Sequence, residues 1–339
     1  MLSVAHAGYS ALNMMHFSTL VLALLLSVAS VGAHGQPIRP VPKVGYLGFP
    51  GEPTEGSQHR DAFMAGLRDL GYIPGKGVIV EVRLYSTEVQ LRQALAEFIS
   101  LKTDVIFVGS PFAAMAAKQM RLDIPIVCGS CGDPVENGLV ASLARPGGNV
   151  TGLASLSAEL IGKRIELMKE LFPRKSRFAV FVFPTNPGFQ ATLRALDTAG
   201  RAIGVELKRF DIRSASDFEN AFRLAAAGRT SAVILQDDPL TRSSRGQIAA
   251  LSLKHRLPVS TGVPEVAEAG ALVAYGPDRV QMARRAASFT DRIIKGAKPA
   301  DLPFEQAATF ELILNRKTVE ALGLSIPQQF MMRVDRVIE

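Results

Sequence analysis

Apolar residues at helical spacing recur in several segments of this chain. Within residues 57–70, Phe63, Leu67 and Leu70 occupy positions i, i+4 and i+7, so one face of the segment is apolar. Gly71 follows directly and suits the left-handed conformation that ends many helices. The pattern predicts an amphipathic helix over residues 57–70.

Short runs that are apolar throughout lie between such helical segments. Residues 105–108 read VIFV and residues 232–235 read AVIL. Such runs are typical of central parallel strands, which are buried on both faces. The alternation of strands with helices predicts an α/β fold, in which mostly parallel sheets are flanked by helices.

The second half of the chain repeats the element order of the first. Residues 63–111 read as helix, strand, helix and strand, and residues 191–239 follow the same order with similar spacing and the same closing proline. The match extends to further strands, which pair 44–49 with 178–183, 124–130 with 257–263 and 149–153 with 271–276. Two similar units predict two Rossmann-like lobes with a ligand-binding cleft between them.

A length of 339 residues suits two domains of ordinary size. We expect an N-terminal lobe over residues 43–153 and a C-terminal lobe over residues 154–276, joined by a hinge of several strands. After Gly276 the repeat ends and a helix rich in Arg and Ala begins. We expect residues 277–305 to return to the first lobe. Residues 306–339 should pack near the hinge, in a lobe that the pattern does not assign.

The first residues have the features of an export signal. Residues 17–33 (FSTLVLALLLSVASVGA) form an apolar run that is too short and too rich in Ser for a membrane span. We therefore predict a signal peptide over residues 1–35 and a periplasmic location. No Lys or Arg precedes Arg39, so a translation start at Met14 or Met15, or a retained anchor, is the alternative.

The composition narrows the class of partner. The chain is 47% hydrophobic and 20% charged with a net charge of +7, but its basic residues are scattered and form no run rich in Lys and Arg. A nucleic-acid binder usually concentrates its positive charge. We therefore expect a small-molecule solute as ligand and no nucleic acid.

Ligands of open parallel sheets bind beyond the carboxyl ends of the strands. This rule selects the loops that follow the predicted strands, together with the hinge. The candidate ligand-binding residues are Phe49, Gly109, Ser110, Pro111, Asp133, Thr185, Asn186, Asp237, Asp238 and Tyr275.

Two of these loops occupy equivalent places in the repeat. Ser110 and Pro111 form a helix-start signal, and the free N–H groups of a helix start favour a carboxylate by about 0.3–1 kcal/mol when exposed. A helix cap alone is the other interpretation. Asp237 and Asp238 in the second loop either cap a helix or receive an ammonium group, which makes a zwitterion such as an amino acid our hypothesis for the ligand. Because neighbours in sequence point in different directions, we do not expect these two to form a hydrolytic dyad.

The other candidates also have two interpretations. Asp133 either turns its loop or caps a helix over residues 135–144. Thr185 and Asn186 belong to a turn signal, although Asn186 is equally able to donate to a ligand. Phe49 and Tyr275 either stack on an apolar or aromatic ligand or pack in the core.

Cys128 and Cys131 are the two cysteines of the chain. In an oxidising compartment such a pair can form a disulfide, and two unbonded thiols at a strand end are the other main interpretation. The nearby Gly129, Gly132 and Pro134 disfavour the helix that a redox CxxC motif needs. A single pair without a His partner is weak evidence for zinc.

Motifs of common enzyme classes are missing. Gly45, Gly48 and Gly51 are spaced GxxGxxG instead of GxGxxG, no GxxxxGK[ST] loop occurs, and Ser110 lacks the GxSxG frame. We therefore expect no catalytic residue, no metal and no cofactor. An α/β enzyme that uses the cleft is the least favoured alternative.

Four segments share the pattern of a known family. They are residues 104–117 (DVIFVGSPFAAMAA), 123–153 (DIPIVCGSCGDPVENGLVASLARPGGNVTGL), 162–173 (GKRIELMKELFP) and 293–327 (IIKGAKPADLPFEQAATFELILNRKTVEALGLSIP). These segments resemble the ABC transporter substrate-binding proteins of the tryptophan/tyrosine type, and the resemblance covers nearly all of residues 41–339. It implies a type I periplasmic-binding fold whose lobes close on a small molecule and deliver it to a membrane permease driven by a separate ATPase.

The chain departs from the family pattern at three places. Ser110 stands where Thr is usual, residues 121–123 (RLD) replace a stretch that commonly holds a Thr, and the pair Cys128 and Cys131 is not usual. Members of the family take aromatic amino acids. The last two departures lie in or near the expected cleft, so the resemblance does not fix the identity of the ligand of this chain.

These observations predict an exported, monomeric solute-binding component of an ABC importer. We expect it to capture an amino acid or a related carboxylate and to pass this solute to permease subunits. An aromatic solute is the narrower form of this prediction. A sensor module that presents the same ligand to a membrane receptor is the alternative.

Overall fold

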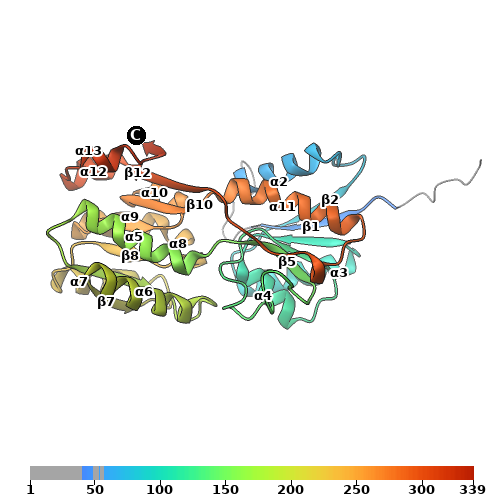
Figure 1. The fold of residues 1–339 in the computed structure, drawn as a ribbon, viewed down its shortest axis with the longest axis horizontal. Coiled ribbons are helices and arrows are strands. Elements are labelled where there is room, and N and C mark those ends of the chain that lie inside the picture. Colours follow the sequence, from blue (N-terminus) through green and yellow to red (C-terminus); the bar gives the residue numbers. More distant parts are fainter. Residues whose placement is uncertain (1–39, 49–52, 54–56) are drawn as a thin grey trace, which may run out of the picture. The chain divides into compact units, whose positions relative to one another are not determined.

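The computed structural model describes residues 40–48, 53 and 57–339, and their strands form two sheets (Figure 1). The predicted signal peptide over residues 1–35 and the candidate Phe49 lie outside the described residues. None of the helices described is long and apolar enough to cross a membrane.

The first sheet has the strand order β11-β5-β4-β3-β1-β2, and all of its neighbouring pairs are parallel. Its strands are β1 (Lys43–Leu47), β2 (Ile79–Arg83), β3 (Val105–Val108), β4 (Ile126–Cys128), β5 (Val150–Ala154) and β11 (Glu305–Gln306). The predicted strand over residues 105–108 is β3, and all four of its side chains are buried.

The second sheet has the order β13-β12-β10-β9-β8-β6-β7. Its strands are β6 (Arg177–Val182), β7 (Glu206–Asp211), β8 (Val233–Leu235), β9 (Val259–Thr261), β10 (Val273–Pro277), β12 (Phe310–Asn315) and β13 (Arg336–Ile338). β10 and β12 are antiparallel, and the other pairs are parallel. The orders β2-β1-β3-β4-β5 and β7-β6-β8-β9-β10 are equivalent, so the predicted fold of two similar α/β units is confirmed.

Helices pack against both sheets. Those of the first sheet are α2 (Gln58–Asp69), α3 (Glu88–Ser100), α4 (Pro111–Gln119) and α11 (Arg279–Ile294). Those of the second are α5 (Ser157–Leu171), α6 (Phe189–Ile203), α7 (Asp217–Ala227), α8 (Pro239–Ser243), α9 (Arg245–His255), α10 (Pro264–Ala269), α12 (Arg316–Leu322) and α13 (Gln328–Met331). The segment after α11 contains the short 3₁₀ helix η2 (Pro299–Asp301).

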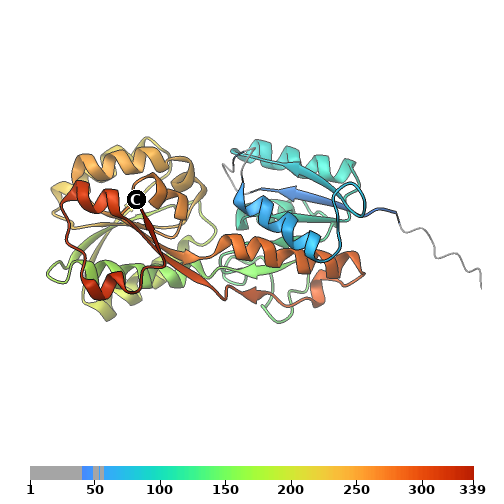
Figure 2. The same ribbon diagram turned by 90° about the horizontal axis from the view of Figure 1, so that it is seen from above.

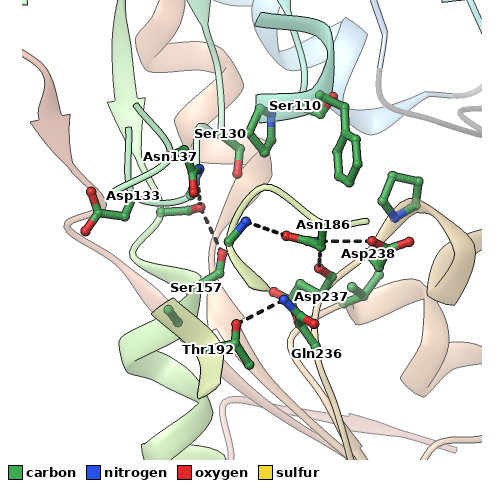
Figure 3. Close-up of a pocket in the computed structure, with 18 of the residues that line it drawn as sticks. Ser110, Ser130, Asp133, Asn137, Ser157, Asn186, Thr192, Gln236, Asp237 and Asp238 are labelled. Carbon is green, nitrogen blue, oxygen red and sulfur yellow. Dashed lines mark hydrogen bonds between the residues drawn. The ribbon is translucent and has the colours of Figure 1, made fainter. Parts of the chain in front are cut away.

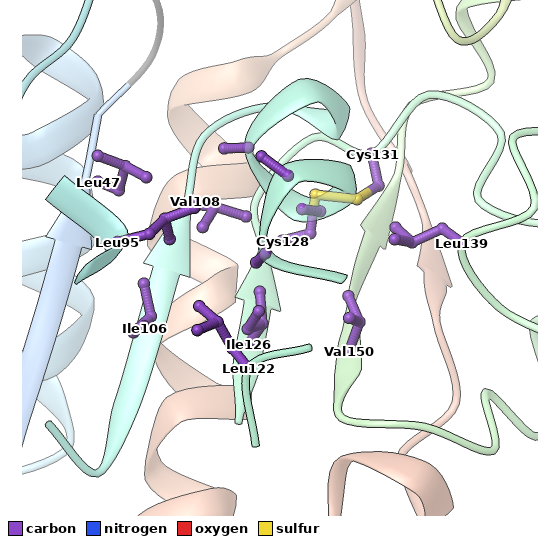
Figure 4. Packing of buried hydrophobic residues seen from close by; sticks show 14 of the residues in the cluster. Leu47, Leu95, Ile106, Val108, Leu122, Ile126, Cys128, Cys131, Leu139 and Val150 are labelled. Atoms are coloured by element: carbon purple, nitrogen blue, oxygen red, sulfur yellow. A yellow bond between two sulfur atoms is a disulfide. The ribbon is translucent and has the colours of Figure 1, made fainter. Parts of the chain in front are cut away.

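α2 and α11 come from distant parts of the chain and lie side by side on one face of the first sheet (Figure 2). α2 is the helix predicted over residues 57–70, and the side chain of Ser57 caps it by accepting the N–H of Arg60. Gly66 permits the close approach, because a Cβ at this position would lie 2.4 Å from the main-chain oxygen of Arg284. α3 and α4 cover the opposite face, where their apolar residues pack on β3 and β4 (Figure 4).

In the part of the chain that the structure describes, the polypeptide passes between the sheets three times, from β5 to α5, from β10 to α11 and from β11 to β12. β11 pairs with β5, so the segment after α11 lies with the first sheet. β12 and β13 extend the second sheet, which accounts for the C-terminal segment that the sequence pattern left unassigned. The exact lobe boundaries stay a prediction.

Candidate functional site

Loops at the carboxyl ends of β3, β4, β6 and β8 surround a cavity of about 90 Å³, which we call the inner cavity (Figure 3). β1 and β3 are neighbours in the first sheet, and β6 and β8 are neighbours in the second, so the strand order reverses here in both sheets. Ligands of doubly wound sheets bind at such reversal points. The polar side chains on its wall are Ser110, Ser130, Asp133, Asn137, Ser155, Ser157, Asn186, Thr192, Gln236, Asp237, Asp238, Arg242 and Arg279.

α4 begins at the inner cavity. Ser110 is its N-cap, and its Oγ accepts the N–H of Ala113 at 3.4 Å and lies 2.7 Å from the hydroxyl oxygen of Tyr85. Pro111 occupies the first turn of the helix, so the helix start predicted from the Ser-Pro pair is confirmed. Gly109 and Pro111 also line the cavity. Contact between these residues and a ligand stays a prediction.

Asp238 begins α8 at the equivalent place in the second half. Its Oδ1 accepts the N–H of Leu240 at 2.9 Å, and its Oδ2 accepts the side-chain amide of Asn186 at 2.8 Å. Burial raises the pKa of the Asp238 carboxyl to about 6, although the bonds from Asn186 and Leu240 oppose that rise. Asp238 therefore caps a helix, and its contact with a ligand ammonium group stays a prediction.

Asp237 is bound by two buried arginines. Nη1 of Arg164 donates to its Oδ1 at 2.5 Å, and Nη2 of Arg279 donates to its Oδ2 at 3.2 Å. The N–H of Gly262 also donates to Oδ1, at 3.1 Å. Burial alone would raise the pKa of Asp237, but the two guanidinium groups outweigh it and hold the pKa below its usual range. Both oxygens of Asp237 thus already accept from the protein, and contact between Asp237 and a ligand ammonium group stays a prediction.

Arg164 and Arg279 were not among the candidates from the sequence. Arg164 is 1% exposed and lies on α5 between the buried Ile161, Ile165 and Met168. A charged residue within an apolar helix face signals a buried partner, because an unpaired buried charge is costly. Arg279 begins α11, which packs on the first sheet, whereas Asp237 follows β8 of the second. Their ion pair therefore joins the two halves next to the inner cavity.

Asp133 turns the loop after β4. Its Oδ1 accepts the N–H groups of Val135 and Glu136, each at 3.0 Å. Residues 134–138 form turns, so the alternative of a helix over residues 135–144 is wrong. Glu136 within this turn makes an exposed ion pair with Arg194 of α6, a second link between the halves.

Asn186 joins the two loops of the second half. Its Nδ2 donates to the main-chain oxygen of Asp237 at 3.0 Å as well as to Asp238, and its Oδ1 accepts the N–H of Gly188 at 2.8 Å. The turn predicted from the Thr-Asn-Pro run is therefore present. Thr185 does not line the inner cavity but a larger neighbouring one of about 760 Å³.

Tyr275 lies away from the inner cavity. Its ring stacks on that of Phe310 in the adjacent strand β12, with the ring centroids 6.2 Å apart. This contact favours the core-packing interpretation over stacking on a ligand.

Most of the uncharged polar residues on the wall were also not among the candidates from the sequence. Gln236 is 4% exposed; its Oε1 accepts the N–H of Phe183 at 2.9 Å and its Nε2 donates to Thr192 at 3.0 Å. Oδ1 of Asn137 is buried and has no hydrogen-bond partner in the described part of the chain. Asn, Gln, Ser and Thr occur throughout any chain, so only their place relative to the strand ends distinguishes these residues.

Cys128 and Cys131 form a disulfide (Figure 4). Both are fully buried at the end of β4. The bond closes the loop that carries Ser130 and leads to Gly132, and both of these line the inner cavity. Among the described residues, no group of three or more His, Cys, Asp or Glu side chains is arranged to hold a metal ion.

Comparisons with known proteins match this chain to one family of binding proteins. The family model of "ABC transporter substrate binding protein" matches residues 55–338. A "Tyrosine-binding protein" of Clostridioides difficile is 26% identical over 266 residues, which cover 78% of this chain and 76% of that protein.

Solved structures show the same fold. A conserved domain protein from Vibrio cholerae superposes with a TM-score of 0.81 at 24% identity, covering 88% of this chain and 99% of that one. An ABC domain in complex with L-Trp from Streptococcus pneumonia superposes with a TM-score of 0.79 at 20% identity and the same coverage. The match of the family model to most of the chain shows that this protein belongs to the family of ABC transporter substrate-binding proteins.

Proposed function

We propose that this protein is the solute-binding component of an ABC importer, and that it holds an amino acid or a related carboxylate in the inner cavity. The observation that carries the proposal is the composition of the cavity wall, which combines strand-end residues from both halves. A solute that contacts both halves favours their closed arrangement. Only such differential binding can shift an equilibrium between open and closed states.

Positive groups on the wall fit the carboxylate of the solute. The guanidinium groups of Arg242 and Arg279 line the cavity, and the N-terminus of α4 at Ser110 opens onto it. Guanidinium groups form strong charge-assisted hydrogen bonds with carboxylates, and helix N-termini favour negative charge. Asp237 neutralises part of this charge and holds Arg279 in place.

Acceptors on the wall fit an ammonium group. Oδ1 of Asn137 is a buried acceptor open to a donor. Asp238, with a pKa of about 6, is largely ionised at neutral pH. Asp133 also lines the cavity. A zwitterion therefore fits, and the names of the tyrosine-binding relative and of the L-Trp complex support an amino acid.

We place the protein outside the cytoplasm, as a monomer that hands its solute to permease subunits. The buried disulfide supports this location, because such bonds persist in oxidising compartments. The residues on the wall bind and orient the solute, and we assign none of them a catalytic role.

Isothermal titration of the purified protein with L-tyrosine and L-tryptophan tests the proposal. Tyramine and tryptamine, which lack the carboxylate, are the matched control ligands. We expect a micromolar Kd for at least one amino acid, equivalent to about −8 kcal/mol, and at least hundredfold weaker binding of the amines. Equal binding of amine and amino acid, or no binding of any carboxylate, would overturn it.

A further inference from the structure

The loop after β4 forms part of the wall of the inner cavity. β4 ends at Cys128, and the disulfide joins this residue to Cys131, so Ser130 lies within the closed loop. Ser130 and the nearby Asn137 line the same cavity (Figure 3). The cross-link therefore lies directly beside two polar side chains of the proposed solute site.

Hydrogen bonds attach the residues on either side of Ser130 to different strands. The N–H of Gly129 donates to the main-chain oxygen of Val108 in β3 at 2.8 Å. The N–H of Cys131 donates to the main-chain oxygen of Leu153 in β5 at 2.9 Å. β3 and β5 are not neighbours, because β4 lies between them. The disulfide thus ties the two ends of the loop to each other, with Ser130 between them.

The same loop orients the amide of Asn137. Its Nδ2 donates to the main-chain oxygen of Cys131 at 3.4 Å, which is a long hydrogen bond that a small displacement of Cys131 would break. Because the amide group is rigid, this bond decides where Oδ1 points. Oδ1 is buried and has no hydrogen-bond partner among the described residues. A buried acceptor in this state is costly, so a donor on the solute is a suitable partner for it.

Opening the disulfide would displace Cys131. Both sulfur atoms belong to fully buried residues in the apolar core of the first half (Figure 4). Two thiols need more space than two bonded sulfur atoms, and a close-packed core accommodates extra volume only by a shift. Cys128 is held in β4 by strand pairing on both sides, whereas Cys131 lies beyond the strand. The shift therefore falls on Cys131, and it changes the positions of Ser130 and of the Asn137 amide.

We propose that the disulfide between Cys128 and Cys131 is a positioning element of the solute site, which holds Ser130 and the amide of Asn137 in the arrangement that binds the solute. The protein then has its full affinity only while this bond is closed. The inference rests on the proposed function, because a solute in the inner cavity is what these two side chains contact.

A dithiol such as dithiothreitol opens the bond in two exchange steps. Its thiolate attacks the sulfur of one cysteine, and the other cysteine leaves as a thiolate that takes up a proton. The second thiol of the reductant, as a thiolate, then attacks the mixed disulfide and releases the first cysteine, which also takes up a proton. Both cysteines are reduced to thiols, and the reductant is oxidised to a cyclic disulfide. Oxidised glutathione reverses the change by the same exchange chemistry.

The test measures the Kd of L-tyrosine and L-tryptophan by titration calorimetry. Cys128→Ala/Cys131→Ala should weaken binding about tenfold, because the loop must then be ordered when the solute binds. Wild type that dithiothreitol has reduced to two titratable thiols should show the same loss, and reoxidation should restore the affinity. This second arm replaces the first if the double variant does not fold.

Leu122→Ala is the control for a loss of stability alone. Leu122 packs in the same apolar core as the two cysteines but does not line the inner cavity. The substitution should lower the melting temperature of the unliganded protein, because it leaves a cavity in the core. Its Kd should stay within about twofold of the wild type, because the loop of Ser130 keeps its cross-link.

A double-mutant cycle separates positioning from a merely structural role. Its background is Ser130→Ala/Asn137→Ala, which lacks the two side chains that the disulfide positions. Removal of the disulfide in this background should weaken binding less than about twofold, because residues that act as a unit have effects that do not add.

The outcomes distinguish the two proposals. A loss of affinity in the wild-type background that disappears in the Ser130→Ala/Asn137→Ala background supports the positioning role. An unchanged Kd without the disulfide, or the same loss in both backgrounds, overturns this role and leaves the proposed function standing. A folded wild type that binds no carboxylate overturns the proposed function and the positioning role with it.

Discussion

Ser110 and Asp238 adopt the same backbone conformation at equivalent places in the two halves of the chain. Both have φ of −152°, their ψ angles are 156° and 150°, and each precedes a proline in the first turn of a helix. Each side chain accepts an N–H of that first turn. The repeat thus places two helix starts on the wall of one cavity, and the two differ in charge.

This difference predicts a pH effect that belongs to Asp238. Burial raises the pKa of Asp238 to about 6 in the folded protein, above its value in the unfolded chain. The folded state therefore binds the proton more tightly. The stability contributed by this proton is present at low pH and is lost as the pH rises through 6. The free energy of unfolding of the wild type relative to Asp238→Asn should therefore fall between pH 4 and pH 6, by at most about 1.4 kcal/mol per pH unit.

Asp238→Asn is a suitable reference because Asn is also a good N-cap residue. Urea denaturation of both proteins at closely spaced pH values measures the difference. A difference that is constant from pH 4 to pH 7, or that grows with pH, would show that burial does not raise the pKa of Asp238.

The buried cluster around Asp237 predicts a large loss of stability for Asp237→Asn. The side chains of Arg164 and Asp237 are 1% and 10% exposed, and removal of the carboxylate charge leaves the guanidinium groups without their anion. Breaking a buried ion pair from one side costs about 3–5 kcal/mol. The free energy of unfolding from urea titration at pH 7 measures this loss.

Glu206→Gln provides the matched control, because the Arg177–Glu206 ion pair is 44% and 59% exposed. Exposed pairs contribute about 0–1 kcal/mol. If both substitutions lowered stability by the same amount, the Asp237 cluster would not be a buried, charge-paired core.

Arg279 and Glu136 both link the two halves, and they should differ in their effect on ligand affinity. The Arg279–Asp237 pair is 11% and 10% exposed, whereas the Arg194–Glu136 pair is 61% and 48% exposed. We expect Arg279→Ala to weaken L-tryptophan binding at least tenfold, because it removes both a buried link between the halves and a cation on the cavity wall. Glu136→Ala should change the Kd less than about fivefold, since an exposed pair is worth about 0.2–1 kcal/mol. Titration calorimetry distinguishes them, and equal effects would contradict the importance of the buried pair.

The disulfide predicts a measurable contribution to stability. Cys128 and Cys131 are three residues apart, so their bond closes a very short loop, for which chain entropy alone gives about 2 kcal/mol. The double variant Cys128→Ala/Cys131→Ala should lose about that much in the free energy of unfolding. Thiol titration of the denatured wild type should find free cysteines only after reduction, and free thiols before reduction would contradict the bond.

Local signals in the sequence account for most of the fold. The buried strand β3 follows from four consecutive apolar residues, and the start of α4 follows from Ser110 and Pro111, because both signals act over a few neighbouring residues. Because the two halves are equivalent, the strands of both could be located, and the loops that follow them include those that line the cavity.

Tertiary contacts decide the features that the sequence analysis missed. Asp237 is paired through residues that are distant in the chain, because Arg164 and Arg279 donate to its two oxygens. Tyr275 packs on Phe310 because β12 returns antiparallel beside β10. No short motif encodes these partnerships, although the charged Arg164 within the apolar face of α5 was a usable sign.

Native mass spectrometry of the purified protein mixed with equimolar free amino acids gives the most direct test of the central claim. The account predicts one solute molecule per chain, selected from the mixture, aromatic, and released on activation with its mass unchanged. A chain that carries no solute, or one that releases a chemically altered molecule, would contradict it.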